Sequence, residues 1–82
     1  MPHMNLKPGA AQVLYEARER LGLSRVDLER VTKHAGHKVS EATIFNIERG
    51  VSARPYPRTV YALADALGLD PSDLLQAEEV AS

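Results

Sequence analysis

The chain has 82 residues, enough for one small domain, and it contains no cysteine, which excludes disulfide bonds and metal sites held by thiolates. No apolar run approaches the roughly 18 residues of a membrane span and no basic-then-apolar leader is present, so we expect a cytoplasmic protein with no membrane partner. The formal net charge of −1 argues, as an average, against a protein that binds polyanions. Residues 1–4 have the character of a cloning remnant, residues 5–76 are expected to fold as the domain, and residues 77–82 are expected to form a frayed C-terminal tail.

The charge is distributed unevenly along the chain. Residues 1–23 carry a net charge of +1, residues 24–61 a net charge of +3, and residues 62–82 a net charge of −5. The middle of the chain can therefore present a basic surface although the whole chain is slightly acidic. Taken alone, an excess of three charges is better explained as an ordinary solvated face.

Glycines, prolines and capping residues divide the chain into five short helical segments, and no segment alternates apolar and polar residues as a strand would. The first helix is expected at 10–21, ending before Gly22, with one apolar stripe along its length. The second follows the N-cap Ser24, with Asp27 completing a capping box, and ends at Gly36. The inward-facing residues of these two helices are predicted to be Val13, Leu14, Ala17 and Leu21, then Val26, Leu28, Val31 and Ala35.

The third helix is expected to begin after the N-cap Ser40 and to run through Glu48, with Ile44 and Ile47 facing inward. With the preceding helix and the connection that contains Gly36, it has the layout of a helix–turn–helix, whose second helix lies in the major groove of DNA. Two successive short helices occur in many small helical proteins, so on spacing alone a plain helical bundle is the better interpretation.

A loop with two prolines separates the third helix from a fourth, which Pro57 is placed to start and Gly68 to end. Asp70-Pro71 and an acidic first turn then predict a fifth short helix that carries Leu74 and Leu75. The predicted fold class is therefore all-α, with five helices.

Several stretches of the sequence form one ordered pattern between residues 13 and 75. They are Leu21-Gly22-Leu23-Ser24 followed by Leu28, then Thr43-Ile44-Phe45-Asn46-Ile47-Glu48-Arg49-Gly50, then Pro55 and Pro57, Leu63-Ala64-Asp65-Ala66-Leu67-Gly68-Leu69, and Asp73-Leu74-Leu75. This pattern resembles the Cro/repressor-type (lambda-repressor-like, XRE) helix–turn–helix family, and its Ile-Glu-Arg-Gly and Leu-Ala-x-Ala-Leu-Gly elements are the most specific part. The resemblance implies a five-helix fold with the helix–turn–helix at helices two and three, and sequence-specific binding of double-stranded DNA, commonly as a two-fold dimer.

The resemblance also implies roles for individual residues. Arg18 and Glu48 match a pair that forms an internal salt bridge in the family, so a structural role is expected for both. The positions that match base-reading residues are Ser40, Glu41, Ala42 and Asn46. The candidates for phosphate contacts are Arg25, Lys38, Thr43, Arg49, Ser52, Arg54 and Tyr56.

The chemistry of three base-reading candidates can be stated more closely. Asn46 can pair with adenine N6 and N7 through both atoms of its amide. Ser40 can cap its helix or donate to a phosphate, and both roles remain open. Glu41 can accept a hydrogen bond from cytosine N4, or act as a first-turn acid that interacts with the helix dipole, and the second role is slightly favoured.

The sequence departs from the family pattern in two places. Glu29 stands where the family usually has alanine, so its side chain must point outward or push the two helices apart. The connection from 32 to 39 is about five residues longer than the common turn, an extension that costs little loop entropy, and Lys33 and Lys38 make it basic. It also contains His34 and His37, but without a third ligand they do not form a convincing metal site, and none is expected.

Two functions fit these observations. The first is a DNA-binding transcriptional regulator, most simply a repressor, that binds a palindromic operator as a homodimer through apolar contacts around Leu69, Leu74 and Leu75. The alternative is a protein-interaction module of the same fold, such as an antitoxin or regulatory partner, without specific DNA binding; Glu29, Glu41 and the acidic last third favour it. The chain has no arrangement of catalytic residues, so neither an enzyme activity nor a cofactor or small-molecule ligand is expected.

Overall fold

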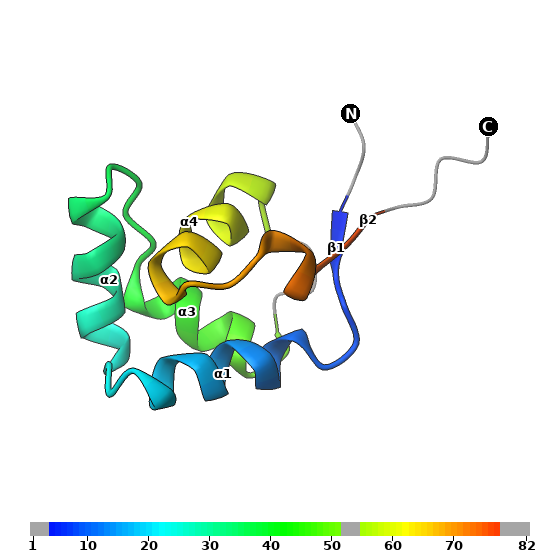
Figure 1. Cartoon of the computed structure of the whole chain (residues 1–82), viewed down its shortest axis with the longest axis horizontal. Coiled ribbons are helices and arrows are strands. Elements are labelled where there is room, and N and C mark those ends of the chain that lie inside the picture. The colour runs from blue at the N-terminus through cyan, green and yellow to red at the C-terminus, as the bar shows by residue number, and fades with distance from the viewer. Residues whose placement is uncertain (1–3, 52–54, 78–82) are drawn as a thin grey trace.

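The computed structural model describes residues 4–51 and 55–77, which form four α-helices and one small sheet (Figure 1). The helices are α1 (Ala10–Arg20), α2 (Arg25–His34), α3 (Glu41–Glu48) and α4 (Pro57–Leu67). A 3₁₀ turn, η1 (Pro71–Asp73), leads into strand β2 (Leu75–Ala77), which pairs antiparallel with strand β1 (Met4–Leu6) at the end of the molecule opposite α2. None of the helices in these two stretches is long and apolar enough to cross a membrane.

The first four helices lie where the capping residues predict them. The hydroxyl of Ser24 accepts a hydrogen bond from the Asp27 backbone N–H, and the Asp27 carboxylate accepts one from the Ser24 N–H, both at 3.0 Å. Ser40 accepts from the Thr43 N–H at 3.2 Å, so both helices of the helix–turn–helix have satisfied N-termini. Gly68 adopts a φ of 71°, a left-handed conformation that ends α4.

The predicted fifth helix is present only as a 3₁₀ turn, so the count of five helices is not confirmed, and the predicted absence of strands is wrong. The Asp70 carboxylate does cap the expected turn, accepting from the Ser72 N–H at 2.9 Å, but the helical conformation lasts only for η1. The chain then extends because its next residues pair with a strand from the opposite end of the sequence, which a local pattern cannot reveal. The ladder includes Met4 and Ala77, one residue beyond the expected domain bounds at each end, whereas 1–3 and 78–82 lie outside the described residues.

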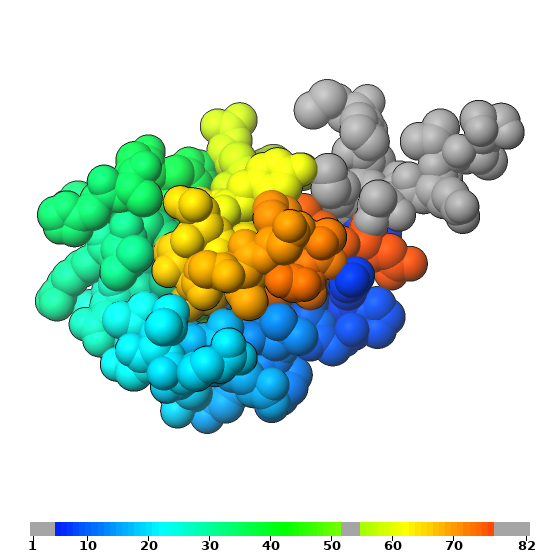
Figure 2. Space-filling model, in the orientation of Figure 1, coloured from blue at the N-terminus to red at the C-terminus, as the bar shows by residue number. Residues whose placement is uncertain are grey.

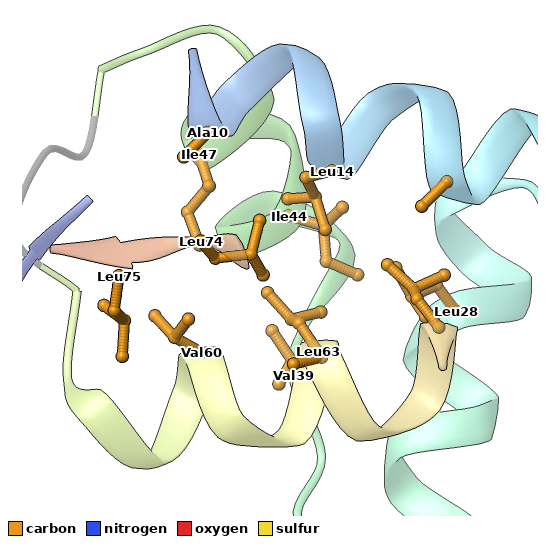
Figure 3. Packing of buried hydrophobic residues seen from close by; sticks show 13 residues of the cluster. Ala10, Leu14, Leu28, Val39, Ile44, Ile47, Val60, Leu63, Leu74 and Leu75 are labelled. Carbon is orange, nitrogen blue, oxygen red and sulfur yellow. The ribbon is translucent and has the colours of Figure 1, made fainter. Parts of the chain in front are cut away.

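A single hydrophobic core lies between the helices. Leu14 of α1, Ile44 of α3 and Leu63 of α4 converge at its centre (Figure 3). The turn of η1 packs over the same region, where Figure 2 shows it against α1. Leu74 and Leu75 are only 2% and 5% exposed, so the expectation that they provide dimer contacts is also wrong: both belong to the core of one chain.

The buried face of α2 differs from the prediction. Leu28 is fully buried as expected, but the other fully buried residue of this helix is the polar Thr32, one turn further on. A prediction from apolar residues alone therefore misplaces the inner face of α2. A threonine can be buried when its hydroxyl has hydrogen-bond partners, and such a prediction does not consider it. Three predicted inward residues of this segment, Val26, Val31 and Ala35, are exposed, as is Leu21 at the end of α1.

Thr32 organises the long connection between α2 and α3. Its hydroxyl donates to the Glu29 carbonyl and accepts from the Val39 N–H, both at 2.9 Å, and its carbonyl accepts from the His37 N–H at 3.0 Å. Val39 is 2% exposed and fills the core beside these bonds. The extra residues are thus held as an ordered turn at the start of α3.

Replacing Thr32 by valine tests this arrangement. Thr32→Val keeps the shape of the side chain but leaves the buried Val39 N–H without a partner, which we expect to destabilise the fold by about 1–3 kcal/mol. Urea denaturation measures the loss, and hydrogen exchange should show faster exchange of the Val39 amide. Thr32→Ser keeps the hydroxyl and should keep that amide protected. Unchanged protection in Thr32→Val would contradict this role.

Two capping carboxylates predict a pH dependence. Hydrogen bonds from Ser24 lower the pKa of Asp27, and hydrogen bonds from Ser72 lower the pKa of Asp70, each below the ordinary value of 3.8. A carboxyl whose pKa is lowered by folding stabilises the fold above its unfolded pKa, and this stabilisation is lost as the pH falls through the folded value. The free energy of unfolding should therefore fall as the pH drops below 3.8. Asp27→Asn and Asp70→Asn should each flatten this fall in urea titrations, with Asp65→Asn on α4 as the control for charge loss; equal slopes in all variants would refute the assignment.

Candidate nucleic-acid interface

One face of α3 is turned away from the core. Ile44 and Ile47 are buried, and the Glu48 side chain is only 6% exposed. The exposed positions follow one another at i, i+1, i+4, i+5 and i+8, the spacing of a single stripe on a helix. We call this surface the outer stripe of α3, and its residues are Glu41, Ala42, Phe45, Asn46 and Arg49.

Ser40, the first base-reading candidate, is engaged within the chain. Besides accepting from the Thr43 N–H, its hydroxyl lies 2.9 Å from the Thr43 hydroxyl and shares a hydrogen bond with it. The sequence left a capping role and a phosphate contact open for Ser40, and in the structure its hydroxyl caps α3. Thr43, a phosphate candidate, is half-buried in the same contact.

Glu29 spans the gap between α2 and α3 instead of forcing the helices apart. Its carboxylate accepts a hydrogen bond from the Glu41 N–H at 2.7 Å, and its second oxygen lies 3.9 Å from the Lys38 ammonium. This carboxylate is a second cap on α3, placed where the helix N-terminus would otherwise attract an anion. It also partly neutralises Lys38, which the sequence suggests as a phosphate contact.

Arg18 and Glu48 form the expected internal ion pair. The Arg18 guanidinium donates to both Glu48 oxygens, at 2.7 and 3.0 Å, and also to the Leu23 carbonyl at 2.8 Å. The Arg18 and Glu48 side chains are 4% and 6% exposed. The hydrogen bond with Glu48 raises the pKa of Arg18, so the charge of Arg18 is fixed. This pair joins the end of α1 to the end of α3 and to the turn before α2.

Phe45 is a site residue that sequence reasoning missed. The Arg25 guanidinium carbon lies 4.9 Å from the centre of its ring, and that of Arg49 lies 5.2 Å from it, both within cation–π range. Arg25 is also 3.6 Å from a Glu48 oxygen, which connects this surface group to the buried ion pair. The sequence did offer one signal. Phe45 lies next to Asn46 and does not share the helix face of the buried Ile44, so its position alone places it near the base-reading candidates.

The remaining candidates are placed less uniformly. Arg25 and Arg49 meet at the C-terminal half of the outer stripe, whereas Lys38 lies beside its N-terminal end. Tyr56 is 77% exposed just before α4. Ser52 and Arg54 lie outside the described residues. Within the described ranges, no group of three His, Cys, Asp or Glu residues could hold a metal ion.

The arrangement of α2, a held turn and an outward-facing α3 agrees with a comparison against protein families. A sequence profile described as helix–turn–helix matches residues 14–74, which include most of α1 and all of α2 to α4. The chain belongs to the Cro/repressor-type helix–turn–helix family. This is a family of DNA-binding regulators, generally without enzymatic activity. No curated protein matches the chain.

Removing Glu48 tests the ion pair of this helix–turn–helix domain. Glu48→Ala leaves Arg18 as an uncompensated buried charge, which we expect to cost about 3–5 kcal/mol of unfolding free energy in urea denaturation. Replacing both partners by apolar residues, Arg18→Met with Glu48→Leu, should recover much of that loss. Glu19 also contacts Arg18, at 3.4 Å, but is 55% exposed, so Glu19→Ala should cost only about 0–1 kcal/mol. Similar losses from Glu48→Ala and Glu19→Ala would show that burial of the pair has no special effect.

Proposed function

We propose that this protein is a transcriptional repressor that binds a palindromic operator in double-stranded DNA as a homodimer, with α3 in the major groove. The observation that carries the proposal is the outer stripe of α3: a continuous exposed face on a helix whose other face is fixed by the core and by the Arg18–Glu48 pair. A rigid helix with one open face is what groove recognition requires. No cofactor or small-molecule ligand takes part in this proposal.

Base recognition is assigned to the stripe and its N-terminal end. The exposed amide of Asn46 can donate to adenine N7 and accept from adenine N6. The small side chain of Ala42 allows the helix backbone to approach the groove, and Glu41 can accept from cytosine N4. Ser40 stands at the entry to the helix, where its hydroxyl already caps α3.

Phosphate contacts are assigned to cationic and hydroxyl groups around the stripe. Arg49 is the strongest candidate, because its guanidinium lies at the exposed face of α3. Arg25 lies at the same face but shares its charge with Glu48, as Lys38 shares its charge with Glu29. The remaining assignments are Thr43, Ser52, Arg54 and Tyr56.

A second candidate function is a protein-interaction module of this fold, such as an antitoxin or regulatory partner, without specific DNA binding. The observation that favours it is the pair of carboxylates at the start of α3. Glu29 and Glu41 both lie at the helix end that would approach a DNA phosphate, and like charges repel.

Selection from random DNA duplexes at two salt concentrations separates these functions. We expect enrichment of a palindrome whose half-sites lie about 34 Å apart. The affinity should fall steeply as salt rises: for each phosphate contact, the logarithm of the binding constant should fall by about 0.9 per tenfold rise in salt concentration. No enrichment even at low salt would reject specific DNA binding and favour the interaction module.

Asn46 gives a sharper test on the selected operator. Asn46→Ala should relax the preference at one base pair in each half-site by about 1–3 kcal/mol and leave thermal stability unchanged. Gln12→Ala removes an exposed amide from α1 and is the matched control, with unchanged preference. Uniform weakening on all sequences would instead make Asn46 a backbone contact.

A further inference from the structure

Phe45 is an apolar side chain on a surface that otherwise carries polar and small groups. It is the only phenylalanine of the chain, and it is 38% exposed in the middle of the outer stripe. Its neighbours along the stripe are Glu41 and Ala42 on one side and Arg49 on the other. A large aromatic ring left open at the centre of a candidate interface contributes most when a partner covers it.

The ring is held in place by cations. Arg25 and Arg49 lie 4.9 and 5.2 Å from its centre, and Arg25 is itself 3.6 Å from a Glu48 oxygen. Because Glu48 is locked by Arg18, this contact fixes Arg25 and, through it, the face of the ring. Phe45 therefore lies beside two guanidiniums, and a partner with an apolar group flanked by negative charges would complement this surface.

The major groove of DNA has this combination. The C5-methyl group of thymine is the apolar feature on its floor, and phosphates line both edges. We propose that Phe45 determines specificity by packing against a thymine methyl group, while Arg25 and Arg49 contact the flanking phosphates. This inference rests on the DNA binding proposed above and adds a residue and a base preference to it.

Single replacements of thymine by deoxyuridine in the selected operator test the contact, because each removes one methyl group and keeps the base pair. With the unaltered protein, replacement of the thymine at one particular position of the half-site should lower the affinity for the operator about fourfold. This is the value expected for the loss of one buried methyl group. Phe45→Ala should bind more weakly and show no further loss at that position. Asn46→Ala, the matched control on the same stripe, should keep the fourfold loss, and Phe45→Leu should keep part of it.

The possible outcomes separate this inference from the proposed function. If an operator is selected but Phe45→Ala keeps the full deoxyuridine effect, or no thymine shows one, the methyl contact is refuted and DNA binding stands. Unchanged affinity and preference in Phe45→Ala would also refute it. If no operator is selected, the proposed function fails and this inference fails with it. Circular dichroism and urea denaturation of each variant exclude misfolding as the cause of any loss.

Discussion

The orientation of α3 depends on the buried ion pair between Arg18 and Glu48. Apolar contacts through Ile44 and Ile47 hold the helix against the core, but hydrophobic contacts are not directional and allow rotation about the helix axis. Two short hydrogen bonds to one carboxylate are directional, and they join helices that are far apart in the sequence. Because Arg18 also binds the Leu23 carbonyl, the same side chain fixes the turn into α2. The outer stripe faces outward as a consequence of this network.

Charge changes sign along α3. Its N-terminal end lies beside the carboxylates of Glu29 and Glu41, whereas the guanidiniums of Arg25, from α2, and of Arg49, at the C-cap of α3, lie beside Phe45. A nearly neutral chain can therefore present a strong local field without a large non-specific affinity for polyanions. The contacts that discriminate between sequences then account for more of the total binding energy than they would in a strongly basic protein.

The four helices could be predicted because their signals are local. Caps such as Ser24 and Ser40, and the glycines that end helices, act within a few residues of chain. The Arg18–Glu48 pair was accessible only through the family resemblance, since no spacing rule joins the two positions. The strand pairing was missed because the partners lie at opposite ends of the sequence. Phe45 was missed because two cation–π contacts mark it as a site residue, and one of them comes from Arg25 on another helix, which no local pattern reveals.

The β1–β2 ladder has a mechanical consequence. Since it joins the two ends of the described chain, all four helices lie within the loop that it closes, and the ladder can form only when they are already close to their final places. The ladder has only three paired residues in each strand. Short elements at the ends of a chain are among the first to open in local unfolding. Opening of the ladder would release the buried Leu75. A pulling force applied to the two ends of the domain would therefore act first on the β1–β2 ladder and only afterwards on α3.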